Sequence, residues 1–322
     1  MTIDSIYEPI QEDLTKVEES LKAFCMADDY PWMGEYLRYA LGDGGKRIRP
    51  ALVLLAAKFH RYDLKALIPV ATAVEVFHNA TLVHDDFVDK SPLRRGKPSV
   101  VSVSGDSVAL LLGDYLFAGS ADLVATTGNR RVTQLFAQTI MKICSGQLKE
   151  LTSAYNWQRN QQDYFAEIDS KTATLFSTAA ESGAILSEAT EDAEDALRNY
   201  GRELGMAFQV IDDILDYIGD EKKLGKPAGS DLLQGTVTLP AILFIESYPG
   251  DNPLKEVFEK KGDRAEVQRF IDMVGNSSAV QQCYSIAAGF IAQACRAVER
   301  LPDNTTRRSL LDLADYVVER HK

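Results

Sequence analysis

The sequence has few of the features that mark secretion, membrane insertion or a disulfide framework. Its N-terminus has neither a basic start nor an apolar core, so we expect no signal peptide. The longest unbroken apolar run is Ala51 to Ala57, whereas a membrane-spanning helix needs about 20 residues. Four cysteines are scattered without Cys-x-x-Cys spacing, which argues against a zinc site or a disulfide framework. We therefore expect a cytoplasmic protein with no integral membrane segment.

Positive charge is also scarce. The 322 residues include 35 Lys and Arg against 47 Asp and Glu, which gives a net charge of −12. An acidic chain is a poor candidate for binding nucleic acid, so we expect no such partner. If the protein handles phosphates, it must use metal ions or a local basic cluster.

Proline is absent between Pro98 and Pro227, although it is the strongest breaker of helices. Apolar residues recur mostly at spacings of three and four, and strand signals are weak throughout. Neither a linker nor a shift in composition divides the chain. The sequence predicts one all-α domain over residues 1–322 with ten or more helices. Residues 106–126 are apolar on nearly every face, so we expect that helix to be buried on all sides.

Two acidic segments share one pattern, Asp-Asp-x-x-Asp, at residues 85–89 and 212–216. Each closes an apolar stretch with helical spacing, and positions i and i+4 of a helix lie on one face. Two carboxylates side by side repel each other, and desolvation raises the cost. Mg²⁺ is the natural compensating ion because it binds oxygen ligands and completes its shell with water and phosphate. One such segment is often a solvated helix face, but two copies on apolar helices indicate a metal site.

Basic and polar residues near these segments suit a diphosphate. Lys46, Arg47 and Arg49 follow a glycine turn, and Arg94 and Arg95 follow the first acidic segment. The arginine fork binds phosphate through two hydrogen bonds. Taken singly, each residue also has an ordinary interpretation, such as a solvated turn or a surface lysine whose stem covers apolar neighbours.

The chain resembles the trans-isoprenyl diphosphate synthases, also called polyprenyl synthases, of long-chain or geranylgeranyl type. The matching segments lie in the family's order and are GGKRIRP (44–50), HNATLVHDDFVDKSPLRRGKPS (78–99), GDYL (113–116), KTATLF (171–176), FQVIDDILD (208–216), GKPAGSDLLQG (225–235) and TLP (238–240). The resemblance implies a large single-domain helical bundle around a deep central cavity, usually assembled as a homodimer. It implies that an allylic diphosphate ionises, isopentenyl diphosphate attacks the cation, and a proton is lost.

The resemblance also assigns roles by position. The residues implied to bind three Mg²⁺ ions directly are Asp85, Asp89 and Asp212. Those implied to act behind them or through water are Asp86, Asp213 and Asp216. The residues implied to hold the allylic diphosphate are Arg94, Lys171 and Lys226. Those implied to hold isopentenyl diphosphate are Lys46, Arg49, His78 and Arg95. The residues implied to line the site of the cation are Thr172 and Gln209.

The sequence departs from the family pattern at two places. Thr236 stands where the family usually has Lys, and Gly146-Gln147 stands where it often has Gly-Glu. Three alternatives stay open: a shorter-chain farnesyl diphosphate synthase, a class I terpene cyclase and a non-catalytic subunit of a heteromeric prenyltransferase. A cyclase normally has a different second metal motif, and a non-catalytic subunit typically lacks some of the aspartates present here.

Product length is predicted from helix geometry. Ala80 and Thr81 precede Asp85 by five and four residues, roughly 6–8 Å below the metal site at about 1.5 Å per residue. Short-chain relatives usually place an aromatic floor there, whereas both residues here are small. Phe77, roughly 12 Å down, or Phe136 is the candidate floor, although both also suit a plain core. We expect a product of roughly twenty carbons or more, and an Ala80→Phe substitution should shorten it.

Overall fold

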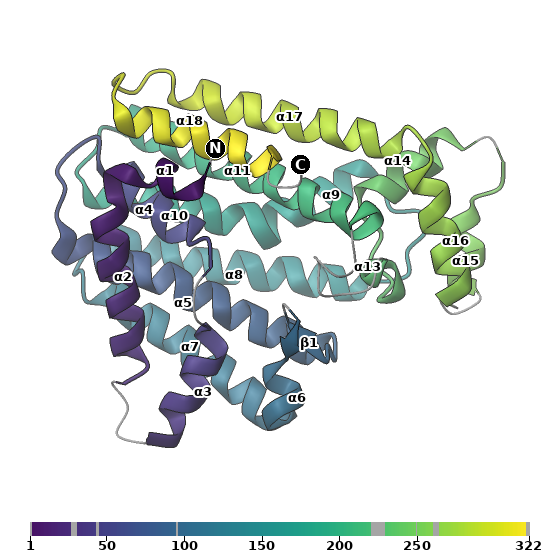
Figure 1. The fold of residues 1–322 in the computed structure, drawn as a ribbon, viewed down its shortest axis with the longest axis horizontal. Helices are drawn as coiled ribbons and strands as arrows, with labels where there is room; N and C mark the ends of the chain where they lie inside the picture. Colours follow the sequence, from purple (N-terminus) through teal and green to yellow (C-terminus); the bar gives the residue numbers. More distant parts are fainter. Residues whose placement is uncertain are drawn as a thin grey trace.

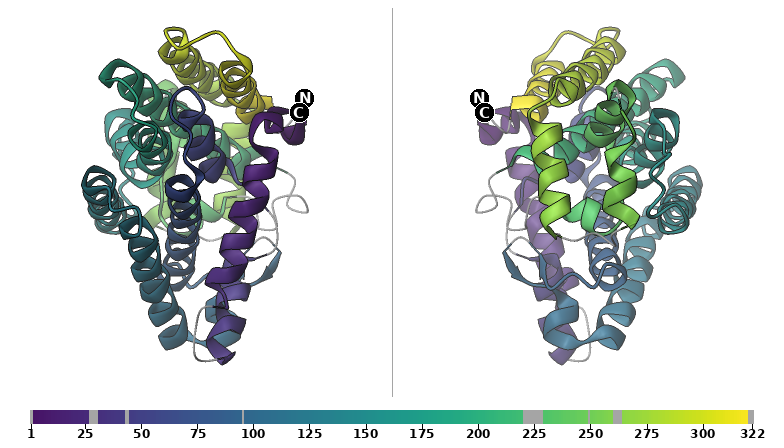
Figure 2. Two further views of the ribbon diagram at one scale, coloured as in Figure 1. Left: turned by 90° about the vertical axis from the view of Figure 1, so that its left-hand side faces the viewer. Right: turned by 90° about the vertical axis from the view of Figure 1, so that its right-hand side faces the viewer.

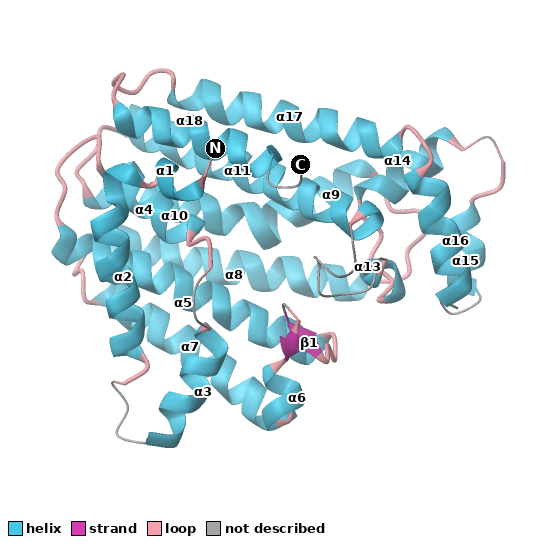
Figure 3. Cartoon of the chain, viewed as in Figure 1, coloured by secondary structure: helices cyan, strands magenta, loops and turns pink. Residues whose placement is uncertain are grey.

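The computed structural model describes residues 2–26, 31–42, 45–94, 96–219, 229–248, 250–259 and 264–319. These residues are helical apart from connecting turns and one short antiparallel ribbon, coloured magenta in Figure 3. The elements are α1 (Ile3–Ile6), η1 (Glu8–Ile10), α2 (Gln11–Phe24), α3 (Pro31–Leu41), α4 (Ile48–Ala57), α5 (Leu64–Val88), β1 (Leu93–Arg94), β2 (Lys97–Pro98), α6 (Val100–Ser104), α7 (Asp106–Ala125), α8 (Arg130–Thr152), α9 (Gln161–Ile168), η2 (Asp169–Ala173), α10 (Thr174–Leu186), α11 (Glu191–Ile218), α13 (Ser230–Leu233), α14 (Leu239–Ser247), α15 (Pro253–Glu259), α16 (Arg264–Gly275), α17 (Ala279–Val298) and α18 (Thr305–Glu319). The prediction of an all-α fold is confirmed.

The long helices run side by side along the longest axis of the molecule. In Figure 1, α5, α8, α11 and α17 lie roughly parallel to that axis, while α2 crosses one end and α15 and α16 form the other. The first and the last described helices, α1 and α18, contact each other on one side of the molecule (Figure 2). Such a bundle lets each helix bury its apolar stripe against its neighbours.

Helices α5 and α11 carry the two acidic segments, and local signals explain where both begin. The Asp63 carboxylate caps α5 by accepting a hydrogen bond from the backbone N–H of Lys65, and the Thr190 hydroxyl caps α11. Both helices end at or near their Asp-Asp-x-x-Asp segments: α5 ends at Val88 with Asp89 as its C-cap residue, and α11 ends at Ile218, two residues past Asp216. Carboxylates near a helix C-terminus are disfavoured by the helix dipole. The placement therefore costs stability and indicates function.

The buried apolar side chains form two hydrophobic cores, and α11 contributes to both. One core gathers α4, α5, α7, α8 and α10, with Leu204 from α11. The other gathers α14, α16 and α17, with Val210 from the next turns of α11. That shared helix joins the two cores, while the single domain over residues 1–322 stays a prediction.

The expectation that the helix at residues 106–126 is buried on all sides is wrong. Only one face of α7 packs against the bundle, and Leu110 and Leu111 are 41% and 66% exposed. A helix that is apolar on every face is more stable when it is buried. The sequence does not show, however, that other helices of the same chain cover each of these faces. The remaining face of α7 lacks cover within the described part of the chain.

Among the described residues, α5 and α7 have the length and composition of a membrane-spanning helix. For α5, 67% of the most apolar window is buried inside the bundle, so it is a core helix of the fold. The same fraction is 33% for α7.

Candidate active site

One cavity of about 170 Å³ collects residues from the two segments that contain the acidic motifs and from two further basic or polar segments. Asp85, in the last turn of α5, and Asp212, in α11, both line it. The predicted residues that line it are Arg49, His78, Thr81, Asp85, Lys171, Thr172, Gln209 and Asp212. These residues come from four separate parts of the chain, and the tertiary fold brings them together.

The electrostatics of the first acidic segment favour a bound cation. Burial raises the pKa of Asp85, and it raises that of Asp89 to about 6, even though Lys171 opposes both shifts. Burial would lower the pKa of Lys171, but the negative charges of Asp85 and Glu150 outweigh it and raise that pKa. Burial thus disfavours the charged form of both carboxylates, and the positive charges of Lys171 and Arg94 offset only part of that effect on their pKa values.

Asp213 and Asp216 of the second segment point away from the cavity into the protein. Asp213 accepts hydrogen bonds from the Tyr164 hydroxyl (2.5 Å) and the Gln209 amide (2.8 Å). Asp216 accepts from the Ser230 hydroxyl at 2.9 Å. Asp213 is rotated by about 100° from Asp212 around the helix, and Asp216 lies one turn further along it. Of the three, only Asp212 lines the cavity. Asp213 and Asp216 are instead hydrogen-bonded to residues of the scaffold.

Asp86 of the first segment fixes the ribbon that follows α5. The Arg94 guanidinium donates two hydrogen bonds to Asp86 Oδ1, from Nε at 3.0 Å and from Nη2 at 2.5 Å. Arg94 lines a neighbouring cavity of about 570 Å³ between α3 and α5, which touches the first cavity at Leu82. The structure thus places Arg94 beside the acidic segment and outside the cavity that holds Asp85.

A chain of hydrogen bonds holds the polar residues implied to lie near the cation. The Thr172 hydroxyl donates to Gln209 Oε1 at 2.8 Å, and Gln209 Nε2 donates to Asp213. The Gln209 side chain is thereby fixed in one orientation. Thr172 belongs to η2, a π-helical turn between α9 and α10, and such turns are frequent at functional sites.

The basic residues near the start of α4 have different surroundings. The Arg49 guanidinium lies 4.4 Å from the Phe176 ring centroid and lines the cavity. The Lys46 ammonium lies over the Tyr316 ring at 5.1 Å and does not line it. Arg95 and Lys226 lie outside the described residues, as does most of the basic segment around Lys226. Thr236 is described, in the turn that follows α13.

Sequence reasoning missed two residues of α8, Gln147 and Glu150. Gln147 lines the cavity, and Glu150 accepts a hydrogen bond from Lys171 Nζ at 2.6 Å. Gln147 belongs to a recognised departure from the family pattern, but its orientation was not predicted. The signal for Glu150 was its position one turn after Gly146, which places both on one face of α8. The chain thus has Gln at position 147, where the family often has Glu, and a carboxylate three residues later, at Glu150.

Of the residues predicted to set product length, only Thr81 lines this cavity. Ala80 is completely buried in the core. Phe77 lies one turn below Thr81, with ring centroids 5.1 Å from Phe117 and 5.4 Å from Phe136. These three rings form a layer, which we call the aromatic layer.

Among the described residues, no three acidic, histidine or cysteine side chains converge as a metal site by themselves. The donor set nevertheless fits Mg²⁺, which uses one or two carboxylates and completes its shell with water and phosphate oxygen. Asp85, Asp89 and Asp212 offer only oxygen. A diphosphate between the two acidic segments would supply the remaining ligands.

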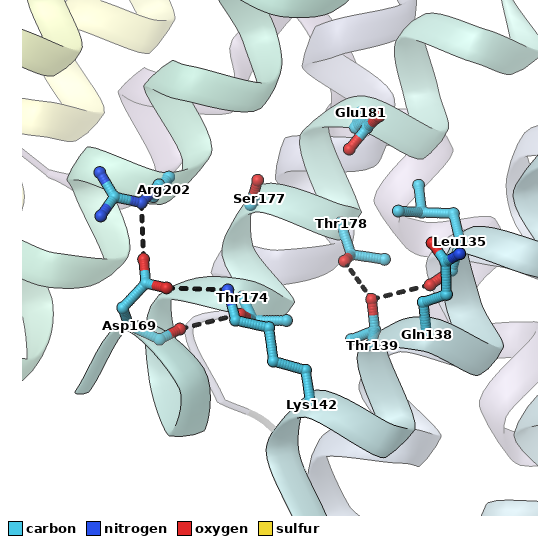
Figure 4. A pocket seen from close by; sticks show the side chains of 10 residues that line it. All are labelled: Leu135, Gln138, Thr139, Lys142, Asp169, Thr174, Ser177, Thr178, Glu181 and Arg202. Atoms are coloured by element: carbon cyan, nitrogen blue, oxygen red, sulfur yellow. Dashed lines mark hydrogen bonds and ion pairs between the residues drawn. The ribbon is translucent and has the colours of Figure 1, made fainter. Parts of the chain in front are cut away.

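A further cavity of about 190 Å³ lies among α8, α10 and α11 and contains none of the predicted residues (Figure 4). Asp169 there accepts hydrogen bonds from Lys142 (2.8 Å) and Arg202 (2.6 Å), both drawn as dashed lines. The Thr139 and Thr178 hydroxyls are hydrogen-bonded beside it. Because Asp169 begins η2, these contacts tie the turn that carries Lys171 to two long helices.

The fold and the site define a class: all-α bundles in which two acidic segments and basic side chains such as Arg49 and Lys171 line one cavity. A sequence model described as polyprenyl synthetase matches residues 30–274. Component 2 of heptaprenyl diphosphate synthase from Geobacillus stearothermophilus is 38% identical, with 99% of each chain covered. The chain therefore belongs to the polyprenyl synthetase family, the trans-isoprenyl diphosphate synthases of long-chain type, and is an enzyme of that class.

Solved structures agree with this assignment. The polyprenyl synthase of Caulobacter crescentus, complexed with calcium and isoprenyl diphosphate, superposes with a TM-score of 0.94 at 32% identity, covering 100% of this chain and 98% of that one. A decaprenyl diphosphate synthase from Rhodobacter capsulatus gives 0.92 at 35% identity and covers both chains completely. The similarity thus extends over the whole fold.

Proposed function

We propose that this protein condenses isopentenyl diphosphate with an allylic diphosphate, head to tail and in trans geometry, to give a long-chain polyprenyl diphosphate. The observation that carries this proposal is that Asp85 and Asp212, 127 positions apart, line one cavity together with Arg49 and Lys171. The bound diphosphate in the Caulobacter relative supports it.

The residues of the cavity divide the work of the reaction. We propose that Asp85, Asp89 and Asp212 hold three Mg²⁺ ions together with the diphosphate. These ions would supply Lewis-acid stabilisation of the leaving group. Lys171 adds a fixed positive charge where negative charge develops as the allylic C–O bond breaks. Asp86 places the ribbon that carries Arg94. Asp213 holds Gln209 in one orientation.

The cation that forms needs polar groups that stabilise it and walls that exclude water. Thr172 and Gln209 present oriented dipoles, while Leu175 and Phe208 line the same cavity with apolar surface. Arg49 and His78 lie where the second diphosphate is held. The double bond of isopentenyl diphosphate attacks the cation, and the departing diphosphate accepts the proton that is lost.

The decisive experiment is an incubation with Mg²⁺, isopentenyl diphosphate and allylic primers of increasing length, followed by chromatography of the products. A polyprenyl diphosphate supports the proposal. A cyclic hydrocarbon from the allylic substrate alone would indicate a terpene cyclase, and a product that stops at farnesyl diphosphate would indicate the shorter-chain alternative.

A second candidate is that the chain is one component of a heteromeric synthase, which the similarity to a protein named component 2 favours. The expected difference is that the purified chain binds substrates but forms no product until a partner chain is added. Activity of the purified chain alone would exclude this candidate.

We expect substitutions at the two diphosphate sites to change the KM values of different substrates. Arg49→Ala should raise the KM for isopentenyl diphosphate by about tenfold or more, because a charge-assisted contact to phosphate is lost. Lys171→Met should act mainly on the allylic substrate and on kcat. Steady-state kinetics with each substrate varied in turn check this, and the reverse pattern would mean that the two sites are exchanged.

We also propose that two copies of the chain assemble through α7 and α8. The apolar side chains exposed on these helices are Leu110, Leu111, Met141, Leu148 and Leu151. Exposed apolar surface of this extent marks an interface in many proteins.

The presence of four free cysteines supports placing the enzyme in the reducing cytoplasm.

The double substitution Leu111→Glu with Met141→Glu should convert a dimer into a monomer, because two charges would be buried at the interface. Light scattering after size-exclusion chromatography measures the mass directly. Tyr248→Glu, at an exposed position beyond α14, is the control and should leave the mass unchanged. A wild-type monomer would contradict the proposal.

A further inference from the structure

Arg47, the middle cation of the basic segment before α4, points into the scaffold. Its guanidinium donates to Glu18 of α2 from Nε at 2.5 Å and from Nη2 at 3.3 Å. Its Nη1 donates to Glu75 of α5 at 2.6 Å. The Arg47 side chain is 9% exposed and that of Glu75 is 10% exposed. One side chain therefore joins two helices at a nearly buried point.

The backbone of Arg47 adopts the left-handed conformation, with φ 45° and ψ 36°. Residues with a Cβ rarely adopt this conformation, and glycine is the usual choice. Such strain persists where the surroundings fix the residue, and it is concentrated at functional sites. At Arg47 the two carboxylates provide that fixation, because the fork of the guanidinium reaches both of them at once.

Two further hydrogen bonds hold the turn, one at Lys46 and one at the carbonyl oxygen of Arg47 itself. The Tyr7 hydroxyl donates to the Lys46 carbonyl oxygen at 2.7 Å, and the Ala51 N–H donates to the Arg47 carbonyl oxygen at 3.0 Å. Arg47 is the N-cap residue of α4, so its conformation sets the direction in which the helix begins.

The turn positions the part of α4 that faces the cavity. Arg49 follows Arg47 by two residues, lies on the Phe176 ring and lines the cavity. Glu75 precedes His78 by three residues on α5, and His78 lines the same cavity. The Arg47–Glu75 pair thus connects the two segments that carry residues implied to hold isopentenyl diphosphate.

We propose that Arg47 is a positioning residue for the isopentenyl diphosphate site. Held by Glu18 and Glu75, it fixes the left-handed turn that directs Arg49 into the cavity. The proposal rests on the proposed function. It adds that the cations of one basic segment have two different roles: Lys46 and Arg49 hold the substrate, and Arg47 positions the turn. The competing interpretation is an ion pair that stabilises the fold and leaves substrate binding unaffected.

The first test uses Arg47→Lys and Glu18→Gln, which keep the size of the side chain and most of its surroundings. A lysine is a point charge that cannot serve both carboxylates in fork geometry. In Arg47→Lys the KM for isopentenyl diphosphate should rise about tenfold, with the allylic KM changed by less than about twofold. Arg61→Lys is the control, since the Arg61–Glu188 pair is exposed and Arg61 lies beyond the other end of α4.

The second test separates turn geometry from charge. In a Glu75→Gln background, which leaves no buried carboxylate unpaired there, Arg47→Gly and Arg47→Ala are compared. Glycine adopts positive φ without penalty, so Arg47→Gly should retain a lower KM for isopentenyl diphosphate than Arg47→Ala. Thermal unfolding of every variant is measured in parallel.

Two results would overturn the positioning role while leaving the proposed function intact. One is an active enzyme in which Arg47→Lys lowers the unfolding temperature but changes neither KM. The other is an equal rise in both KM values. A wild-type chain that forms no prenyl diphosphate with any primer or partner chain would instead overturn the proposed function, and this proposal with it.

Discussion

Replacing Asp85 or Asp212 by alanine is expected to lower kcat by about a thousandfold or more while the fold stays intact. Each substitution removes a carboxylate implied to bind Mg²⁺, and metal stabilisation of the departing diphosphate amounts to several kcal/mol. Both carboxylates face a cavity, and burial already raises the pKa of Asp85. Their removal takes no apolar side chain out of the core, so it should not lower the unfolding temperature.

Three measurements check this expectation: kcat, its dependence on Mg²⁺ concentration and thermal unfolding. Asp192→Ala is the matched control, because Asp192 lies exposed in the first turn of α11, the helix that also carries Asp212. It should leave kcat within about twofold of the wild-type value, as is usual for surface substitutions. Near-normal turnover of Asp85→Ala with unchanged Mg²⁺ dependence would contradict the metal assignment.

A second large effect is expected from Phe77→Ala, which should lengthen the product. Asp85, Thr81 and Phe77 succeed one another at four-residue spacing on α5, so they lie along one face of the helix. Thr81 lines the cavity, and the Phe77 ring below it packs on Phe117 and Phe136. Removing the ring opens the aromatic layer at the depth that a growing chain would reach.

The matched control for Phe77→Ala is Phe270→Ala. Phe270 is equally buried but belongs to the core around α16. Both substitutions should destabilise the protein by about 3–5 kcal/mol, whereas only Phe77→Ala should change the distribution of product lengths. Equal distributions in the two variants would show that Phe77 is an ordinary core residue.

A bulky residue one turn above the layer should have the opposite effect. Thr81→Phe is expected to shorten the product because its ring would enter the cavity, and Thr81→Val, of nearly the same size as Thr, should leave the length unchanged. Ala80 is a poorer position for this test than the sequence suggested. It has no exposed surface, so a ring there would strain the core. A wild-type product of fifteen carbons would contradict the open cavity altogether.

The sequence by itself determined the helical class and the chemistry of the site. Proline absence and apolar spacing act locally, through backbone hydrogen bonds and side-chain contacts within a few residues, so they specify helices without reference to the fold. The pairing of Asp85 with Asp89 on one face has the same local origin. The presence of two acidic segments and several cations in one acidic chain indicated metal and diphosphate before any geometry was known.

Tertiary structure alone decided which member of each segment faces the cavity. Asp212 lines it while Asp213 binds Tyr164, because the rotation of α11 about its axis is set by packing against two cores. Arg47 and Arg49 differ by two positions and have the same side chain, yet one anchors the turn and the other lines the cavity. Glu150 reaches Lys171 for the same reason. Such orientations depend on contacts between residues far apart in the chain, and a periodic pattern within one segment contains no information about them.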